Sequence, residues 1–82
     1  MTLEWGPTFK RDYRSLNAAS KMRVEIALRR LAAGDPKLDT VIVDPRDFTE
    51  AAIVDDFLCV TFQRQPDGFL LLNVRSIEVA AR

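Results

Sequence analysis

The feature that most constrains this fold is a change of hydrophobic period at Gly34. Before Gly34, apolar residues recur every three or four positions, which is the period of an amphipathic helix. After it, β-branched residues gather and alternate with polar ones, which is typical of strands. Gly34 is followed by Asp35 and Pro36, and this combination is a helix stop because proline cannot continue the helix. The sequence therefore predicts helices first and a sheet afterwards.

Two helices are predicted before this stop. Residues 2–5 alternate as a short strand does, Gly6-Pro7 ends it, and a first helix then runs to about Leu16. Asn17 is placed to cap a second helix over about 18–33, so the two helices should form a tight hairpin. The spacing also predicts the buried stripe of the second helix, formed by Met22, Ile26, Ala27, Leu28 and Leu31.

The segments after Gly34 predict strands joined by short turns, at 38–43, 49–54, 57–64 and 69–75. The turn 65–68 should join a hairpin, with Gly68 in a left-handed conformation. Residues 76–82 form a tail of undecided structure. The prediction is a single α+β domain over residues 1–82, in the order β-α-α-β-β-β. An N-terminal strand and a helical hairpin would pack on a mostly antiparallel sheet of three to four strands.

Composition excludes several kinds of site and stabilising element. The chain has 82 residues, 48% of them hydrophobic, which is enough for one core. Cys59 is the only cysteine and there is no histidine, so no internal disulfide, metal site or cofactor is expected. A partner chain is then the expected stabiliser of so small a domain. We find no signal peptide and no run of ~20 apolar residues, so we expect a cytoplasmic protein.

The charges balance overall but not along the chain. Residues 1–37 hold eight basic and four acidic residues, a net of 8 − 4 = +4. Residues 38–82 hold four basic and eight acidic residues, a net of 4 − 8 = −4. This pattern fits either ordinary solvated surfaces or a basic helical face beside an acidic sheet.

The order of elements and several loose motifs resemble the RelE/ParE toxins of bacterial toxin–antitoxin systems, which are also known from plasmid stabilisation. The resemblance covers nearly the whole chain and marks it as a divergent member. The segments that carry it are LEWGP at 3–7, FKRDYRSL at 9–16, the helix at 21–31, VDDF at 54–57 in place of the family's Val-Gly-Asp-Tyr turn, and the hydrophobic strand at 69–74.

The resemblance also shows what has been lost. Ribonuclease members carry arginines just before and just after that turn, and here these positions hold Ile53 and Leu58. The family's C-terminal basic cluster aligns with 76–78, and no tyrosine follows. An acidic sheet half would also repel a phosphate backbone. We therefore expect a protein that is not an enzyme. If it were a ribosome-dependent mRNA endonuclease, Arg64 and Arg75 would bind phosphate, with Tyr13 or Glu78 as proton donor or acceptor.

The two strands of the hairpin predicted at 57–64 and 69–75 are apolar on both sides, although helices can cover only one side. The uncovered side is expected to be a partner-binding surface that includes Phe57, Cys59, Phe69 and Leu71. The alternative is that the tail or loop 44–50 folds over it.

The leading functional hypothesis is a toxin-fold protein of a type II toxin–antitoxin system that acts through protein contacts. Its partner would be an antitoxin or a second copy of itself. As a toxin it would resemble the ParE branch, which poisons a topoisomerase. Two alternatives stay open: an mRNA endonuclease that works on the ribosome, and a non-toxic structural module. No membrane association is expected, and direct nucleic-acid binding has little support.

Overall fold

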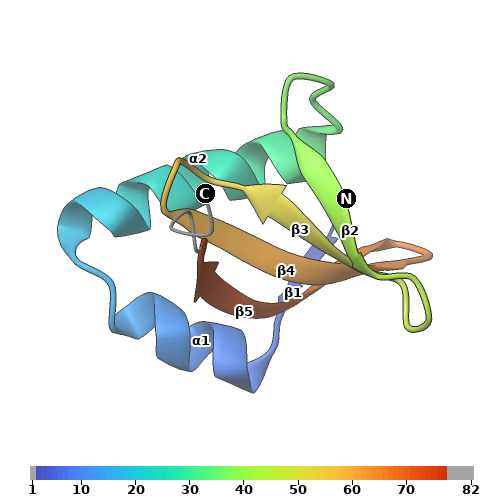
Figure 1. The fold of residues 1–82 in the computed structure, drawn as a ribbon, viewed down its shortest axis with the longest axis horizontal. Helices are drawn as coiled ribbons and strands as arrows, with labels where there is room; N and C mark the ends of the chain where they lie inside the picture. Colours follow the sequence, from blue (N-terminus) through green and yellow to red (C-terminus); the bar gives the residue numbers. More distant parts are fainter. Residues whose placement is uncertain (1, 78–82) are drawn as a thin grey trace.

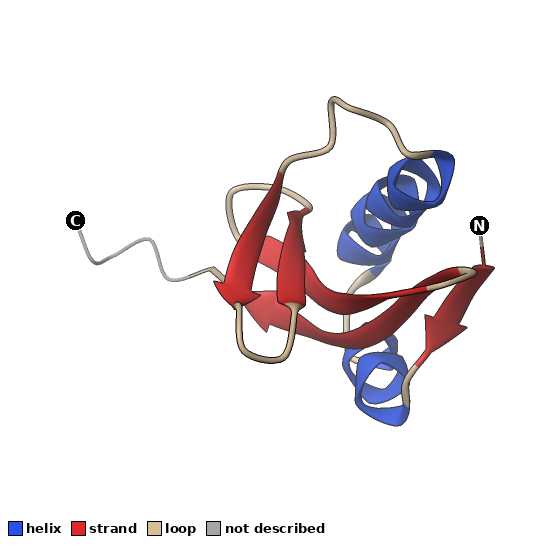
Figure 2. Ribbon diagram, turned by 90° about the vertical axis from the view of Figure 1, so that its right-hand side faces the viewer, coloured by secondary structure: helices blue, strands red, loops and turns tan. Residues whose placement is uncertain are grey.

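The computed structural model describes residues 2–77. Both helices lie on one side of a five-stranded sheet (Figures 1 and 2). The elements are β1 (Thr2–Trp5), α1 (Pro7–Arg14), α2 (Ala18–Ala33), β2 (Thr40–Asp44), β3 (Thr49–Ile53), β4 (Leu58–Gln65) and β5 (Gly68–Ser76). The α+β fold predicted from the sequence is confirmed. The sheet reaches five strands because β2 and β3 both form and β1 joins it.

The sheet order is β1-β5-β4-β3-β2, and every pair except one is antiparallel. The exception is β1, which runs parallel to β5 with Thr2 opposite Gly68. Gly68 is needed for this close approach, since a Cβ there would lie 1.8 Å from the carbonyl oxygen of Thr2. The predicted left-handed conformation of Gly68 is wrong: among residues 2–77 only Gly34 and Phe48 have a positive φ.

The ends of α2 form as the sequence predicts. The Oδ1 atom of Asn17 accepts a hydrogen bond from the backbone N–H of Ser20 at 2.8 Å and so caps the first turn. Gly34 adopts a left-handed conformation with φ of 66°, and the N–H of Asp35 returns to the carbonyl of Arg30 at 2.9 Å. Both signals are local, which is why they can be read from the sequence.

The buried face of α2 differs from the predicted one. Val24, Ala27, Leu28 and Leu31 are buried, whereas Met22 and Ile26 are 64% and 41% exposed. Each residue turns the helix by about 100°, so these two lie on the side opposite the buried stripe. The prediction for Met22 and Ile26 is therefore wrong. The helix carries two apolar stripes, and the sheet covers only one of them.

An irregular register between β4 and β5 determines which residues of these strands reach the core. Val60 lies opposite Val74, but Phe62 lies opposite Leu71, so β5 carries one extra residue at Leu72. This bulge brings Phe69 and Leu71 to the same side as Val60 and Phe62. The resulting core also contains Phe9, Val24, Leu28, Leu31 and Ala52.

Candidate functional site

The second face of the sheet is not the apolar surface expected from the sequence. Phe69 and Leu71 are 3% and 0% exposed and belong to the core beneath the helices. Cys59 is buried on the opposite face, and only Phe57 is exposed, in the turn before β4. The four predicted partner-binding residues therefore form no common surface. The strand period of two predicted that these residues share one side of the hairpin. The bulge at Leu72 breaks that period, so they do not.

Small and polar side chains occupy this second face instead. Thr61 and Ala51 lie opposite each other there and are both buried. The hydroxyl of Thr61 donates to Oδ1 of Asn73 on the neighbouring strand at 2.5 Å. On the same face, the side-chain amide of Gln63 donates to the carbonyl oxygen of Asp47 at 3.1 Å, so the turn between β2 and β3 contacts this face.

Arg64 lies near the end of β4 and is held in place by its neighbours. Its guanidinium donates to both carboxylate oxygens of Glu50, at 2.7 and 3.2 Å. It also lies 5.8 and 5.5 Å from the ring centroids of Phe62 and Phe69. The hydrogen bond to Glu50 raises the pKa of Arg64, so this side chain stays charged.

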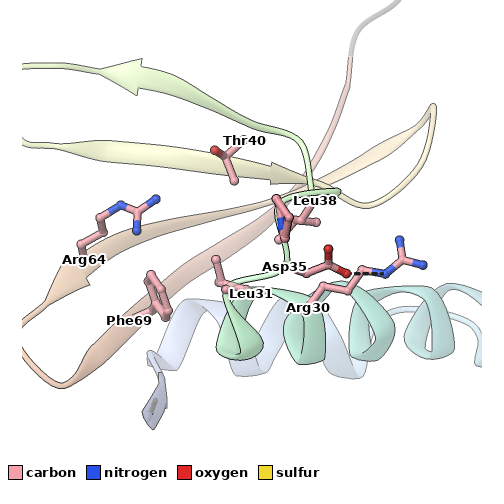
Figure 3. Close-up of a pocket in the computed structure, with 9 residues that line it drawn as sticks. Arg30, Leu31, Asp35, Leu38, Thr40, Arg64 and Phe69 are labelled. Atoms are coloured by element: carbon pink, nitrogen blue, oxygen red, sulfur yellow. Dashed lines mark ion pairs between the residues drawn. The ribbon is translucent and has the colours of Figure 1, made fainter.

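A depression of about 270 Å³ opens beside Arg64, between the end of α2 and the sheet (Figure 3). Its second cation, Arg30, lies 3.9 Å from the carboxylate of Asp35. Both arginines of the depression therefore already have an anionic partner. Asp35 is the only lining carboxylate among residues 2–77 and is paired with Arg30, and the other lining residues, Leu31 and Thr40 among them, include no group suited to acid–base catalysis. A phosphate bound there would compete with Glu50 and Asp35 for the two guanidinium groups.

The remaining ribonuclease candidates lie elsewhere. Arg75 pairs with Cys59, five positions from Arg64 along β4 and on the other face, so about 16 Å of strand separates them. Tyr13 lies on α1, where its hydroxyl donates to Glu25 at 2.7 Å. That hydrogen bond raises the pKa of Tyr13 and makes it a poorer acid. Glu78 lies outside the described residues. The structure therefore does not bring the described candidates, Arg64, Arg75 and Tyr13, into one site.

Exposed apolar side chains gather in two other places. The first is the outer face of α2, formed by Ala18, Lys21, Met22, Glu25, Ile26 and Arg29 around a shallow groove of about 530 Å³. Lys21 and Arg29 flank the apolar pair, and neither has a carboxylate within ion-pair distance among residues 2–77. Glu25 is already engaged by Tyr13. The outer face of α2 is thus an apolar strip bordered by positive charge.

The second place is the edge patch, which we define as Val41, Ile42, Val43 and Phe48. These side chains are between 45% and 76% exposed. They lie on β2, the last strand of the sheet, and on the turn that follows it. The Val-Ile-Val run predicts only an ordinary strand, and the sequence pattern predicts neither of the two exposed patches.

The described residues show neither a metal cluster nor a membrane helix. No group of three or more His, Cys, Asp or Glu residues within 2–77 could hold a metal ion. In the same part of the chain, every helix is too short or too polar to cross a membrane.

Comparison with known proteins shows which solved structures share this architecture. No protein-family model matches the sequence, and no curated protein sequence matches it either. Among solved structures, RelE in the RelB–RelE antitoxin–toxin complex from Methanococcus jannaschii superposes with a TM-score of 0.72 at 13% identity, over 89% of this chain and 88% of that one. YafQ from E. coli gives 0.74 at 11% identity, over 98% and 94%. The YoeB/ParE toxin from Agrobacterium tumefaciens gives 0.71 at 12%, over 94% and 99%. The chain therefore has a RelE/ParE-like toxin fold, as its sequence motifs suggested.

Proposed function

We propose that this protein is the toxin-fold member of a toxin–antitoxin pair and that it works through protein contacts. The shared fold supports this, and the M. jannaschii structure was solved as an antitoxin–toxin complex. As a toxin, the protein would bind a protein target, such as a topoisomerase, in the manner of the ParE branch. Fold alone does not determine activity, so the support has to come from the surface of this chain.

The observation that carries the proposal is the exposure of Met22 and Ile26 on the outer face of α2. Two apolar side chains four residues apart on a helix match the anchors of helix-in-groove recognition. Lys21 and Arg29 border them and favour an acidic partner. The occupant that fits is an amphipathic antitoxin helix, with apolar residues along one side and carboxylates beside them.

The alternative, an mRNA endonuclease, has less support from the same structure. Arg64 is paired with Glu50, and Arg75 lies on the other face of the sheet. The positions that match the family's arginines, Ile53 and Leu58, are partly buried apolar residues. Protein binding needs none of these groups.

Co-expression with the product of a short gene adjacent to this one, where the genome holds such a gene, tests the proposal. The pair should co-purify, and Met22→Asp or Ile26→Asp should weaken binding at least tenfold, or about 1.4 kcal/mol. The added carboxylate removes an apolar contact and repels an acidic helix. Thr8→Asp adds the same charge on exposed α1 and is the matched control. If the neighbour does not bind, the toxin–antitoxin assignment fails. If it binds the Met22 and Ile26 variants as well as the wild type, the antitoxin docks elsewhere.

A further inference from the structure

Among residues 2–77 no strand pairs with the outer edge of β2, and its one protecting feature is the bulge between Ile42 and Asp44. β2 pairs with β3 on one side only, and Thr40, Val41, Ile42 and Val43 are all exposed. Sheet edges are usually protected by lysine, proline or a covering loop, because their backbone groups can pair with another strand. This strand, TVIVD, has no lysine or proline, and Ile42 at its centre is 70% exposed.

The turn after β2 presents a further apolar side chain. Phe48 is 76% exposed and has φ of 60°, a conformation that bulky residues rarely adopt. Asp47 stabilises this conformation: its Oδ1 accepts hydrogen bonds from the backbone N–H and the hydroxyl of Thr49, at 3.1 and 2.6 Å. Phe48 therefore lies outward beside Ile42 and Pro45, around a depression of about 310 Å³. The edge patch extends from the strand onto the turn.

The sequence of β2 is compatible with antiparallel pairing to β2 of a second copy of the protein. In an antiparallel pair centred on Ile42, that residue lies opposite its own copy and Val41 lies opposite Val43. Thr40 then lies opposite Asp44, so no like charges face each other. The net charge of zero adds no long-range repulsion between copies.

We propose that two copies of this protein associate edge to edge through β2, about a twofold axis at Ile42. The two sheets then form one continuous sheet, with the helices of both copies on the same side. The apolar area in the edge patch is on the order of 400 Å² per copy, within the size range of exposed patches that are often functional. A bulge between Ile42 and Asp44 shortens the regular pairing, so the dimer belongs to the small, weak class of interfaces.

Charge substitutions at Ile42 test the axis directly. In Ile42→Lys, two lysines face each other across the axis, and in Ile42→Glu, two glutamates do. Each variant alone should be monomeric in sedimentation at concentrations where the wild type is mostly dimer. An equimolar mixture should regain dimers, because lysine then faces glutamate. Thr8→Lys, which adds a charge on exposed α1, should dimerise like the wild type.

Three results would overturn the proposal: a wild type that stays at the monomer mass of 9.3 kDa from micromolar to millimolar concentration, charged variants that dimerise alone, or a mixture that stays monomeric. Circular dichroism checks that each variant is folded. If either Ile42 variant unfolds, the double variants Val41→Lys/Val43→Glu and Val41→Lys/Val43→Lys replace it. Only the first places opposite charges across the axis, so it should dimerise while the second should not. None of these measurements involves an antitoxin, so their outcome is independent of the proposed function.

Discussion

The carboxylate of Asp12 on α1 accepts a hydrogen bond from the backbone N–H of Val74 on β5, at 3.1 Å. This contact gives a hydrogen-bond acceptor to a backbone N–H on β5 that has no neighbouring strand to pair with. β1 ends at Trp5, opposite Leu71, so the outer edge of β5 beyond that point lacks a neighbouring strand. Asp12 supplies the acceptor there and fixes α1 against the sheet.

We expect Asp12→Ala to lower the free energy of unfolding by about 1–3 kcal/mol, because the N–H of Val74 loses a charged acceptor in a partly buried position. Asp12→Asn keeps an acceptor and should lose less. Urea unfolding measures both. Asp56→Ala, at an exposed position in the β3–β4 turn, should change stability by under about 0.5 kcal/mol. Equal losses in the Asp12 and Asp56 variants would mean that the Val74 contact does not stabilise the fold.

The two stripes of α2 should respond differently to the same kind of truncation. Leu31→Ala removes a buried core side chain and should cost about 2–5 kcal/mol. Met22→Ala shortens an exposed one and should cost under about 0.5 kcal/mol. Urea denaturation of the two variants side by side gives the comparison. A larger loss for Met22→Ala would reverse the assigned faces.

Gly68→Ala should detach β1. The added Cβ would lie 1.8 Å from the carbonyl oxygen of Thr2, so the backbone of β1 has to move. Overpacking of this kind costs about 1–3 kcal/mol or more. Gly34→Ala meets no atom within 4 Å and suffers only from its positive φ, at a cost of about 1–2 kcal/mol. Fluorescence of Trp5, the only tryptophan, should shift in the native state of Gly68→Ala and stay unchanged in Gly34→Ala.

Cys59 should react slowly with thiol reagents in the folded protein. Burial raises the pKa of this thiol, and the charge of Arg75 opposes the shift only in part. A raised pKa means less thiolate at mildly alkaline pH, so alkylation should be at least about tenfold slower than in urea. The same shift favours the folded state below the unfolded pKa, and this contribution is lost as pH rises through the folded pKa. Arg75→Ala removes the opposing charge and should raise the thiol pKa further, which a pH series of alkylation rates would reveal.

Ribosomes programmed with mRNA should show no cleavage in the A site when the protein is added. The reason is geometric, since Arg64 and Arg75 lie on opposite faces of the sheet. Toeprinting provides the measurement, with an active ribonuclease as the positive control. Cleavage that disappears in the Arg64→Ala/Arg75→Ala double variant would instead establish the endonuclease mechanism.

Much of the fold could be predicted because its signals are local. Asn17 and Gly34 act within one helical turn, and the hairpin turn at 65–68 joins adjacent strands. The parallel pairing of β1 could not be predicted in this way. It joins Thr2 to Gly68 across almost the whole chain, and no short-range pattern encodes such a contact.

The candidate site was harder to predict for a different reason. Periodicity shows which residues share a face of a helix or strand, but not which face packs against the rest of the protein. Met22 has the same helical spacing as a core residue, and only the position of the sheet reveals that it is exposed. Likewise, a single extra residue at Leu72 moved Phe69 and Leu71 from the expected open surface into the core. Bulges leave little trace in composition or periodicity.

The parallel pairing of β1 with β5 also governs when the molecule can fold. Among residues 2–77, the first strand, Thr2–Trp5, has its only strand partner in the last one, Gly68–Ser76. During synthesis β1 therefore stays without its strand partner until β5 has emerged from the ribosome. Closing so long a loop before any of its contacts form is entropically costly and slows folding. The sheet of this domain is thus completed only after Gly68–Ser76 has left the ribosome.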